Sequence, residues 1–394
     1  MKVLFLTPRF PFPPVGGDKL RAFHFIRHIA ELGHEVTVAT FVEHPRQLED
    51  PAIRLPPRVR VRAVVLPKLA SWWSTLRGLP SRVPLQVHYY RSRKLARIVR
   101  EELADSDAVW CHFVRMVSYL PPPGSVRVVV DLCDAVSLNL ERANRIRRGL
   151  FALINRIEVG RMKSYELETI ARADRTVFIS DVDVRYLLGE RRDPRIALIQ
   201  NGVDLAGFPF HDGAYEPEQI AFLGNLRYFA NVDAVLWFAK EILPLVRRER
   251  PDVRFAVIGA EPPDEVKALA DGERVVVTGF VESVVPWVQR AAVSVAPLRI
   301  GAGMQNKILE SLALGTPVVA SPLAAEGLDA TKFAVGGDPA AFAAKVLELL
   351  ADPALRRARA RAGRQYVEAS FAWDRALAEV ESCLTGAPFQ PPLS

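Results

Sequence analysis

Lys2-Val-Leu-Phe-Leu-Thr7 and His34-Glu-Val-Thr-Val-Ala-Thr-Phe41 are apolar runs that predict two buried strands, and the residues between them decide the fold. Pro8–Lys19 is a loop rich in proline and glycine. Leu20–Leu32 carries apolar residues at helical spacing and ends at Gly33. A strand, a loop, a helix and a second strand in this order predict a parallel βαβ unit and a doubly wound sheet.

The same alternation continues along the chain and starts afresh after an irregular stretch. Further strands are expected at Val59–Leu66, Ala108–Trp110, Val126–Asp131 and Arg175–Ile179, and then at Gln219–Leu223, Val253–Ile258, Arg274–Val277, Val293–Ala296 and Pro317–Ala320. Between the two series, Asn201-Gly-Val-Asp204 and the residues up to Glu218 break the periodicity. A chain of 394 residues suits two domains. We therefore expect two Rossmann-like α/β domains that face a cleft, at 1–205 and 206–372, and a C-terminal helix and tail at 373–394 that pack on the first domain.

The composition narrows the class of protein. Hydrophobic residues make up 49% of the chain and charged residues 25%, as is typical of globular proteins. The three cysteines, Cys111, Cys133 and Cys383, show no CxxC spacing, which excludes a disulfide framework and a zinc site of the usual kind. The sequence contains no run of about 18 uncharged apolar residues, so it predicts no membrane span. These features indicate a cytoplasmic protein.

The positive charge is unevenly spread. Residues 1–200 hold 33 Lys and Arg against 21 Asp and Glu, whereas residues 201–394 hold 19 against 24. A basic first half indicates an acidic partner (nucleic acid, an anionic membrane or a diphosphate-bearing substrate) or else a solvated surface rich in arginine. No nucleic-acid-binding motif accompanies the charge, so we expect no nucleic-acid partner.

Adjacent tryptophans occur within this basic half. Lys68-Leu-Ala-Ser-Trp72-Trp73-Ser-Thr-Leu-Arg77 is followed by Tyr89-Tyr-Arg-Ser-Arg-Lys94. Tryptophan among basic residues suits a membrane interface, and with it a peripheral position on the inner face of the plasma membrane and a lipid-diphosphate acceptor. The alternative is an insertion that packs over the cleft of the first domain.

Two glycine loops are candidates for binding a phosphate. Val15-Gly16-Gly17-Asp18 follows the first strand and opens a helix. Gly16 and Gly17 let the backbone approach a ligand, and the unpaired N–H groups of the helix N-terminus favour phosphate. The alternative is a tight turn that the neighbouring prolines require.

The second glycine loop opens a later helix within Ala296-Pro-Leu-Arg299-Ile-Gly-Ala-Gly303-Met-Gln-Asn306-Lys307-Ile-Leu-Glu310. Lys307 and Glu310 are three residues apart and therefore share one helical face. A cation beside loop amides suits a diphosphate, and a carboxylate accepts two hydrogen bonds from a ribose diol. The same candidate donor site includes Arg299, Gly303 and Asn306. The alternative is an ion pair on the surface of the helix.

Polar residues also follow other strands, at the sheet edge where ligands gather in open α/β folds. In the first half, His112 and Asp131 end two strands and Asp134 comes shortly after. A structural role is the alternative for each of them. In the second half, Gly224-Asn-Leu-Arg227 follows the first strand, and Arg227 is either a phosphate clamp or a surface arginine.

Residues 299–319 resemble the C-terminal signature of family 4 retaining glycosyltransferases of the GT-B fold. That signature reads Glu-x7-Glu followed by Ala-x-Ala-x-Gly-x-Pro-Val-Val, and here Glu310 precedes Leu-Ala-Leu-Gly-Thr-Pro-Val-Val319. Two further family motifs are similar to Ile199-Gln-Asn-Gly-Val-Asp204 and Gly16-Gly17-x-x-x-Arg21. Hallmarks of the subgroup associated with PEP-CTERM and exosortase exopolysaccharide loci resemble Asn231-Val-Asp-Ala234, Val277-Thr-Gly-Phe-Val281 and Gln305-Asn-Lys-Ile-Leu-Glu310.

The resemblance implies roles for several residues. Glu310 matches the family's second glutamate, which holds the nucleotide ribose. Gly16 and Gly17 match the loop that touches the donor diphosphate, and the backbone near Gly279 and Phe280 matches the region that lines the base.

The chain also departs from the family pattern. The first glutamate of the signature falls at Ala302, and the family's diphosphate-binding Arg and Lys fall at the neutral residues Asn225 and Ala230. The candidates to replace the missing charge are Arg227, Arg299 and Lys307. The family's active-site histidine falls near Asp134, so Asp134 or His112 takes the catalytic role.

The resemblance implies a hexosyltransferase-type enzyme that moves a sugar, with retention, from a nucleotide-sugar donor to a glycan or lipid-linked acceptor in exopolysaccharide or cell-surface glycan synthesis. Its task is to hold the diphosphate and stabilise the charge that grows on it. No DxD-type carboxylate pair stands near the glycine loops, so we expect no metal and no cofactor. The alternatives are a nucleotide-sugar 2-epimerase and a non-catalytic nucleotide-sugar-binding subunit.

Overall fold

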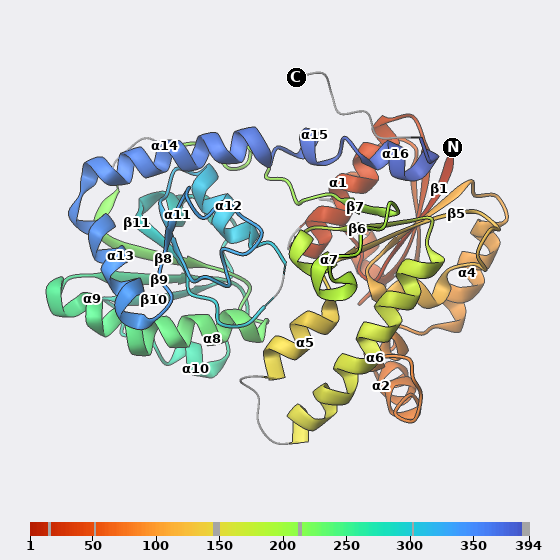
Figure 1. Ribbon diagram of the computed structural model, residues 1–394, viewed down its shortest axis with the longest axis horizontal. Helices are drawn as coiled ribbons and strands as arrows, with labels where there is room; N and C mark the ends of the chain where they lie inside the picture. Colours follow the sequence, from red (N-terminus) through yellow and green to blue (C-terminus); the bar gives the residue numbers. More distant parts are fainter. Residues whose placement is uncertain (15–16, 51–52, 145–149, 212–214, 302, 388–394) are drawn as a thin grey trace. The chain divides into compact units, whose positions relative to one another are not determined.

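The chain forms two compact units in the computed structural model, which describes residues 1–14, 17–50, 53–144, 150–211, 215–301 and 303–387 (Figure 1). Unit 1 comprises Met1–Gln200 and Ala376–Ser394, and unit 2 comprises Asn201–Arg375. The chain therefore passes from one unit to the other twice. The sequence predicts nearby boundaries, at 205/206 and 372/373.

The described residues of unit 1 form a sheet of seven parallel strands in the order β3-β2-β1-β4-β5-β6-β7. The strands are β1 (Lys2–Thr7), β2 (Glu35–Val42), β3 (Val59–Val65), β4 (Ala108–His112), β5 (Arg127–Cys133), β6 (Arg175–Phe178) and β7 (Ile196–Leu198). The central strands are buried along almost their whole length, as continuous apolar runs predict for a parallel sheet. The order reverses between β1 and β4, which makes the carboxyl ends of these strands the switch point of unit 1.

Helices connect these strands, and the C-terminal segment completes the unit. The helices are α1 (Gly17–Glu31), α2 (Lys68–Arg77), α3 (Leu85–Tyr89), α4 (Arg93–Leu103), α5 (Val136–Asn144), α6 (Leu150–Arg172), α7 (Asp181–Leu188) and α16 (Val380–Thr385), with 3₁₀ turns at Pro45–Leu48 and Val114–Tyr119. Helix α16 packs against α1 and β5 (Figure 1). The Nε of Arg127 on β5 donates a hydrogen bond of 2.8 Å to the carbonyl oxygen of Cys383 on α16.

The described residues of unit 2 form a sheet of six parallel strands in the order β10-β9-β8-β11-β12-β13. The strands are β8 (Glu216–Leu223), β9 (Arg254–Ile258), β10 (Val275–Gly279), β11 (Ala291–Ala296), β12 (Val318–Ala320) and β13 (Ala334–Val335). The order reverses between β8 and β11. The switch point of unit 2 therefore lies where β8 runs into Gly224 and β11 runs into the second glycine loop.

The helices of unit 2 show one departure from the expected pattern. They are α8 (Phe229–Trp237), α9 (Leu243–Glu249), α10 (Asp264–Lys267), α11 (Val285–Arg290), α12 (Asn306–Ala313), α13 (Pro339–Ala351), α14 (Pro353–Ser370) and α15 (Trp373–Ala376). The apolar spacing of Asp233–Arg248 predicts one long amphipathic helix, but a π-helical turn at Phe238–Ile242 separates α8 from α9. Pro244 explains the turn, because it lacks the N–H that a regular ladder needs and its ring clashes with the carbonyl four residues earlier. Within the ranges that the structure describes, no helix combines the length and the apolar character that crossing a bilayer requires.

Candidate functional site

The candidate donor site lies at the switch point of unit 2, around the side chain of Lys307. Lys307 stands in the first turn of α12, and its Nζ donates a hydrogen bond to Oδ1 of Asn231 on α8. The same Nζ lies 4.7 Å from the centre of the Phe222 ring. A side chain at Gly224 would come within 3.1 Å of this Nζ. The loop after β8 and the first turn of α12 therefore meet at the Lys307 ammonium.

Lys307 and Glu310 share a face of α12 without forming an ion pair. Among the described residues, no hydrogen bond or ion pair reaches the Glu310 carboxylate. By contrast, Lys345 and Glu348 have the same spacing on α13 and form an ion pair of 2.8 Å. The alternative of a surface ion pair at Lys307 is therefore wrong.

Burial shifts the pKa values of both groups toward neutrality. It lowers the pKa of Lys307 to about 7, and the nearby negative charge of Glu310 offsets only part of this shift. It raises the pKa of Glu310 to about 7, against the opposing effect of Lys307. A half-buried cation and carboxylate that leave each other unpaired are typical of a site that receives a ligand.

The two arginines that the sequence assigns to the donor phosphate already hold carboxylates. Arg299 donates from Nε and Nη2 to the two oxygens of Asp233, at 3.0 and 2.6 Å, and its guanidinium lies 5.4 Å from the Trp237 ring centre. Arg227 donates from Nε to Glu261 at 2.9 Å and forms a second bond to the same carboxylate. Of the three candidate cations, Lys307 is the one for which the described residues supply no carboxylate within ion-pair distance.

Sequence reasoning missed the parts played by Asn231 and Asp233. Asn231 accepts from Lys307 and donates from Nδ2 to the carbonyl oxygen of Asn225 at 2.7 Å, so it ties the β8 loop to α12. Asp233 is the carboxylate that holds Arg299. The motif Asn231-Val-Asp-Ala234 was noticed only as part of the family resemblance. Its partners Lys307 and Arg299 lie 76 and 66 residues further along the chain, so no local spacing could reveal these contacts.

The other donor-site candidates in unit 2 lie at the same edge of the sheet. Gly303 has a φ of 75°, a backbone shape that favours glycine, in the loop before α12. Asn306 opens α12, and its Oδ1 accepts from Nδ2 of Asn201 at 3.1 Å, which joins the Asn201–Asp204 motif to this helix. Gly279 ends β10, and the side chain of Phe280 after it is 70% exposed. Strand β9 separates β10 from β8, so Phe280 lies two strands away from the Gly224 loop.

Unit 1 carries a buried ionic chain at its own switch point. Arg21 of α1 donates from Nε and Nη2 to the two oxygens of Asp131 at 2.9 and 3.0 Å, and Nδ1 of His112 lies 2.9 Å from Asp131 Oδ2. Burial disfavours the Asp131 carboxylate, but the Arg21 charge and the His112 hydrogen bond hold its pKa well below the usual range. His112, Asp131 and Cys133 place three potential metal ligands within 4.8 Å of one another, although both oxygens of Asp131 already serve Arg21.

Asp134 belongs to a second buried group at the end of β5. Burial, and next the charge of Asp183, raise the pKa of Asp134 to about 7, and burial also raises the pKa of Glu166 to about 7. Oδ1 of Asp134 has no hydrogen-bond partner among the described residues. Cys133, directly before it, has a φ of 65°, which is strained for a residue other than glycine and typical of functional positions.

The two catalytic candidates therefore differ in access. The side chain of His112 is fully buried, whereas Asp134 is half-buried. Of the two, only Asp134 has any exposed surface, although its Oδ1 is buried, and His112 is hydrogen-bonded to Asp131. Sequence reasoning missed Asp183 and Glu166, because they come from α7 and α6, far along the chain from Asp134.

The structure describes only part of each of the two glycine loops. Gly16 and Ala302 are outside the described residues. Gly17 is the first residue of α1, which agrees with a glycine loop that opens a helix.

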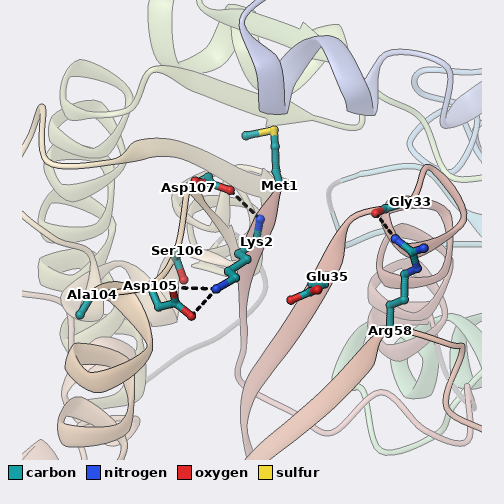
Figure 2. A pocket seen from close by; sticks show the side chains of 9 residues that line it. All are labelled: Met1, Lys2, Gly33, Glu35, Arg58, Ala104, Asp105, Ser106 and Asp107. Atoms are coloured by element: carbon teal, nitrogen blue, oxygen red, sulfur yellow. Dashed lines mark hydrogen bonds and ion pairs between the residues drawn. The ribbon is translucent and has the colours of Figure 1, made fainter.

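A hollow of about 440 Å³ lies at the opposite edge of the unit 1 sheet, at the amino ends of β1 and β2 (Figure 2). Figure 2 shows that both of its cationic side chains already have partners: Lys2 Nζ lies 2.7 Å from Asp105, and Arg58 donates to the Gly33 carbonyl oxygen at 2.6 Å. Ligands of open α/β sheets gather at the carboxyl ends of the strands. We therefore do not assign the candidate site to this hollow.

Comparison with solved structures defines the fold class. The two Rossmann-like units with parallel sheets match the GT-B fold of glycosyltransferases. Sucrose-phosphate synthase of Thermosynechococcus elongatus aligns over 97% of each chain with a TM-score of 0.68 and 17% sequence identity. HepE of Anabaena, in complex with UDP and glucose, aligns over 98% of this chain and 100% of its own with a TM-score of 0.65 and 14% identity.

Comparison of sequences finds partial matches to glycosyltransferases. Residues 217–352 match the family model described as "Glycosyl transferases group 1". Glycogen synthase of Mycobacterium tuberculosis is 31% identical in an alignment of 193 positions that covers 45% of this chain and 45% of the relative. The chain thus spans less than half the length of the curated relative that it matches.

Proposed function

We propose that this chain is a retaining, hexosyltransferase-type glycosyltransferase. It would move a sugar from a nucleotide-sugar donor to a glycan or lipid-linked acceptor in the synthesis of exopolysaccharide or another cell-surface glycan. One observation carries the proposal: Lys307 and Glu310 stand unpaired on one face of α12 at the switch point of unit 2. The match of residues 217–352 to group 1 glycosyltransferases supports it, because both residues fall inside that segment.

Each residue of the donor site has a part in this proposal. Lys307, held in place by Asn231, faces the diphosphate and stabilises the negative charge that grows on it as the sugar leaves. A bound diphosphate favours the charged form of Lys307 and so raises its pKa from about 7. The Glu310 carboxylate accepts hydrogen bonds from the ribose hydroxyls. In this proposal the Lys307 ammonium fills the role that a metal has in other transferases, so the proposal includes no metal.

In unit 1, Asp134 is the residue that we propose to contact a sugar or acceptor hydroxyl. With a pKa of about 7, its carboxyl group is partly protonated near neutral pH and can donate as well as accept a hydrogen bond. A sugar or acceptor hydroxyl at this position would give Oδ1 the partner that it lacks within the described residues. The contacts of Asp131 with Arg21 and His112 hold the end of β5 in place, and Asp134 follows directly after this strand.

Calorimetric titration with UDP, GDP and ADP tests the donor site. UDP comes first because HepE was solved with UDP and glucose. We expect Lys307→Met to weaken the best nucleoside diphosphate by about 10- to 100-fold, since a charged hydrogen bond contributes about 1.5–3 kcal/mol. Glu310→Gln should weaken it less, because an amide still accepts from one ribose hydroxyl.

The matched control is the pair Lys345→Met and Glu348→Gln, which has the same spacing on α13 but is already ion-paired. These variants should bind as the wild type does. Unchanged binding of every nucleotide by Lys307→Met would refute the proposal.

A non-catalytic nucleotide-sugar-binding subunit is the second candidate. The neutral residues Asn225 and Ala230, at positions where the resembling family has cations, favour it. Incubation with nucleotide sugars, with and without a glycan acceptor, separates the candidates. Binding without transfer or hydrolysis identifies a subunit, and an epimer formed from a nucleotide-GlcNAc alone identifies a 2-epimerase.

A further inference from the structure

Helix α2 of unit 1 turns its apolar side toward solvent. Leu69, Trp72, Trp73 and Leu76 follow the spacing of one helical face, and their exposed fractions are 81%, 61%, 63% and 52%. The opposite side is polar and turned inward, since Ser71 is buried. A helix that covers a protein core has the reverse arrangement. The apolar face of α2 is therefore available to a partner outside the chain.

This exposure is built into the unit, because α2 and the segment after it are firmly held. The Trp72 ring packs edge-on against Tyr89 with a centre-to-centre distance of 6.0 Å. On α6, which Figure 1 shows next to α2, Arg161 Nη2 donates to the carbonyl oxygen of Leu79 at 2.6 Å. Also on α6, Glu158 Oε2 accepts from the backbone N–H of Leu85 at 2.7 Å. These contacts fix which side of α2 faces outward.

The stretch of sequence that contains α2 is strongly basic. Residues 51–100 contain twelve Lys and Arg and no Asp or Glu. Eight of these cations lie on or after α2, and all are exposed: Lys68, Arg77, Arg82, Arg91, Arg93, Lys94, Arg97 and Arg100. Within the part of the chain that the structure describes, Arg97 is the one of the eight with an ion pair, to Glu101 at 2.9 Å. Lys68 and Arg77 thus lie at the two ends of the apolar helix, and the sequence after it adds six further exposed cations.

We propose that α2 inserts this apolar face into the interfacial region of an anionic lipid bilayer. Tryptophan side chains favour the headgroup level, and Lys68 and Arg77 at the two ends of the helix can reach lipid phosphates while the face is immersed. The surrounding cations add long-range attraction to anionic lipid. The sequence left open an insertion that packs over the cleft of the first domain, and the exposed fractions of Trp72 and Trp73 favour the bilayer over it.

Charge also decides against a second copy of this chain as the occupant of the face. Two such surfaces would bring together two sets of like charges, which repel. An anionic bilayer complements both the apolar strip and the cations around it. This inference does not depend on glycosyl transfer, although a bilayer would also present a lipid-linked acceptor.

Flotation with vesicles tests the inference, using phosphatidylcholine mixed with phosphatidylglycerol and, separately, phosphatidylcholine alone. The wild type should bind the anionic vesicles more tightly and lose this preference in high salt. Trp72→Ala/Trp73→Ala should reduce binding by roughly tenfold or more, because the interfacial anchors are lost. Lys68→Glu/Arg77→Glu should reduce it by roughly 25-fold or more, at about fivefold for each charge removed and more for its reversal.

Matched controls come from exposed residues elsewhere on unit 1. Leu48→Ala/Leu198→Ala removes exposed apolar side chains, and Arg191→Glu/Arg192→Glu reverses two exposed charges beside the edge strand β7. Both controls should float as the wild type does. Equal losses in the control and test variants would show that only general charge or hydrophobicity matters.

Two results would overturn the inference. The first is wild-type protein that ignores anionic vesicles. The second is a wild type that self-associates in ultracentrifugation while Trp72→Ala/Trp73→Ala stays monomeric, which would make the face a contact between copies. Circular dichroism and thermal unfolding of the same variants show that they are folded, and separate nucleotide titration keeps this outcome distinct from that of the proposed function.

Discussion

Each unit places a cation at the switch point of its sheet, and the two cations have opposite surroundings. In unit 1, Arg21 is buried and holds both oxygens of Asp131. In unit 2, Lys307 contacts the amide oxygen of Asn231 and the ring of Phe222, and no carboxylate of the described residues neutralises it. A cation that is paired with a buried carboxylate stabilises the fold. A cation that contacts only neutral groups keeps a positive charge that can bind an anionic ligand.

The largest effect is expected from breaking the buried pair. Arg21→Met leaves the Asp131 carboxylate buried with His112 alone, and removing one partner of such a pair costs about 3–5 kcal/mol of unfolding free energy. Urea denaturation at neutral pH measures the loss. The loss should narrow as pH falls through the acid range, because Asp131 without the Arg21 charge takes up its proton at a higher pH than in the folded wild type, and a protonated carboxyl no longer needs the missing partner.

Arg185→Met is the matched control, since Arg185 and Asp181 form an exposed i,i+4 ion pair at 2.8 Å. It should cost about 1 kcal/mol or less. A loss as large as that of Arg21→Met would remove the distinction between the two kinds of cation.

A substitution at Asp134 is expected to raise the free energy of unfolding, by less than Arg21→Met lowers it. Folded Asp134 keeps its proton up to about pH 7, whereas in the unfolded chain it ionises near the ordinary value of 3.8, so the wild type loses stability between these values as pH rises. Asp134→Asn removes this loss. We expect the variant to gain about 1–3 kcal/mol at pH 8 and clearly less at pH 5. A gain that is the same at both pH values would contradict the buried position of the carboxyl group.

The smallest effect on stability is expected from Lys307→Met. Lys307 loses its proton near pH 7 in the folded chain and near 10.5 in the unfolded chain, so its burial destabilises the wild type most below pH 7. The variant should gain about 1 kcal/mol or less at pH 6, because Asn231 and Phe222 already compensate part of the burial, and the gain should shrink by pH 9. This pH trend is opposite to that of Asp134→Asn, and a trend in the same direction would be evidence against a buried ammonium.

Much of the fold could be predicted from the sequence. Apolar runs that alternate with helical spacing mark β1, α1 and β2, and the irregular residues after Asn201 mark the change of unit. The glycine loop before α12 and the shared face of Lys307 and Glu310 follow from spacing alone. These features are local, and local patterns are what a sequence shows directly.

The remaining features depend on contacts between distant segments. Asp183 and Glu166 affect the pKa of Asp134 from other helices, and Asn231 meets Lys307 across 76 residues. The outward turn of α2 could not be predicted either. Its apolar spacing fits a helix that covers a core equally well, and only the burial of Ser71 shows which side faces the protein.

The second passage of the chain between units has a practical consequence for anyone who recombines this protein. Because α16 packs on α1 and β5 and Cys383 accepts a hydrogen bond from Arg127, the last turns of the chain belong to the unit that was begun at residue 1. A chimera that borrows unit 2 from another transferase must therefore be spliced at two junctions, near Gln200 and near Arg375. A single splice near Gln200 would replace the tail as well and leave α1 and β5 facing a foreign helix.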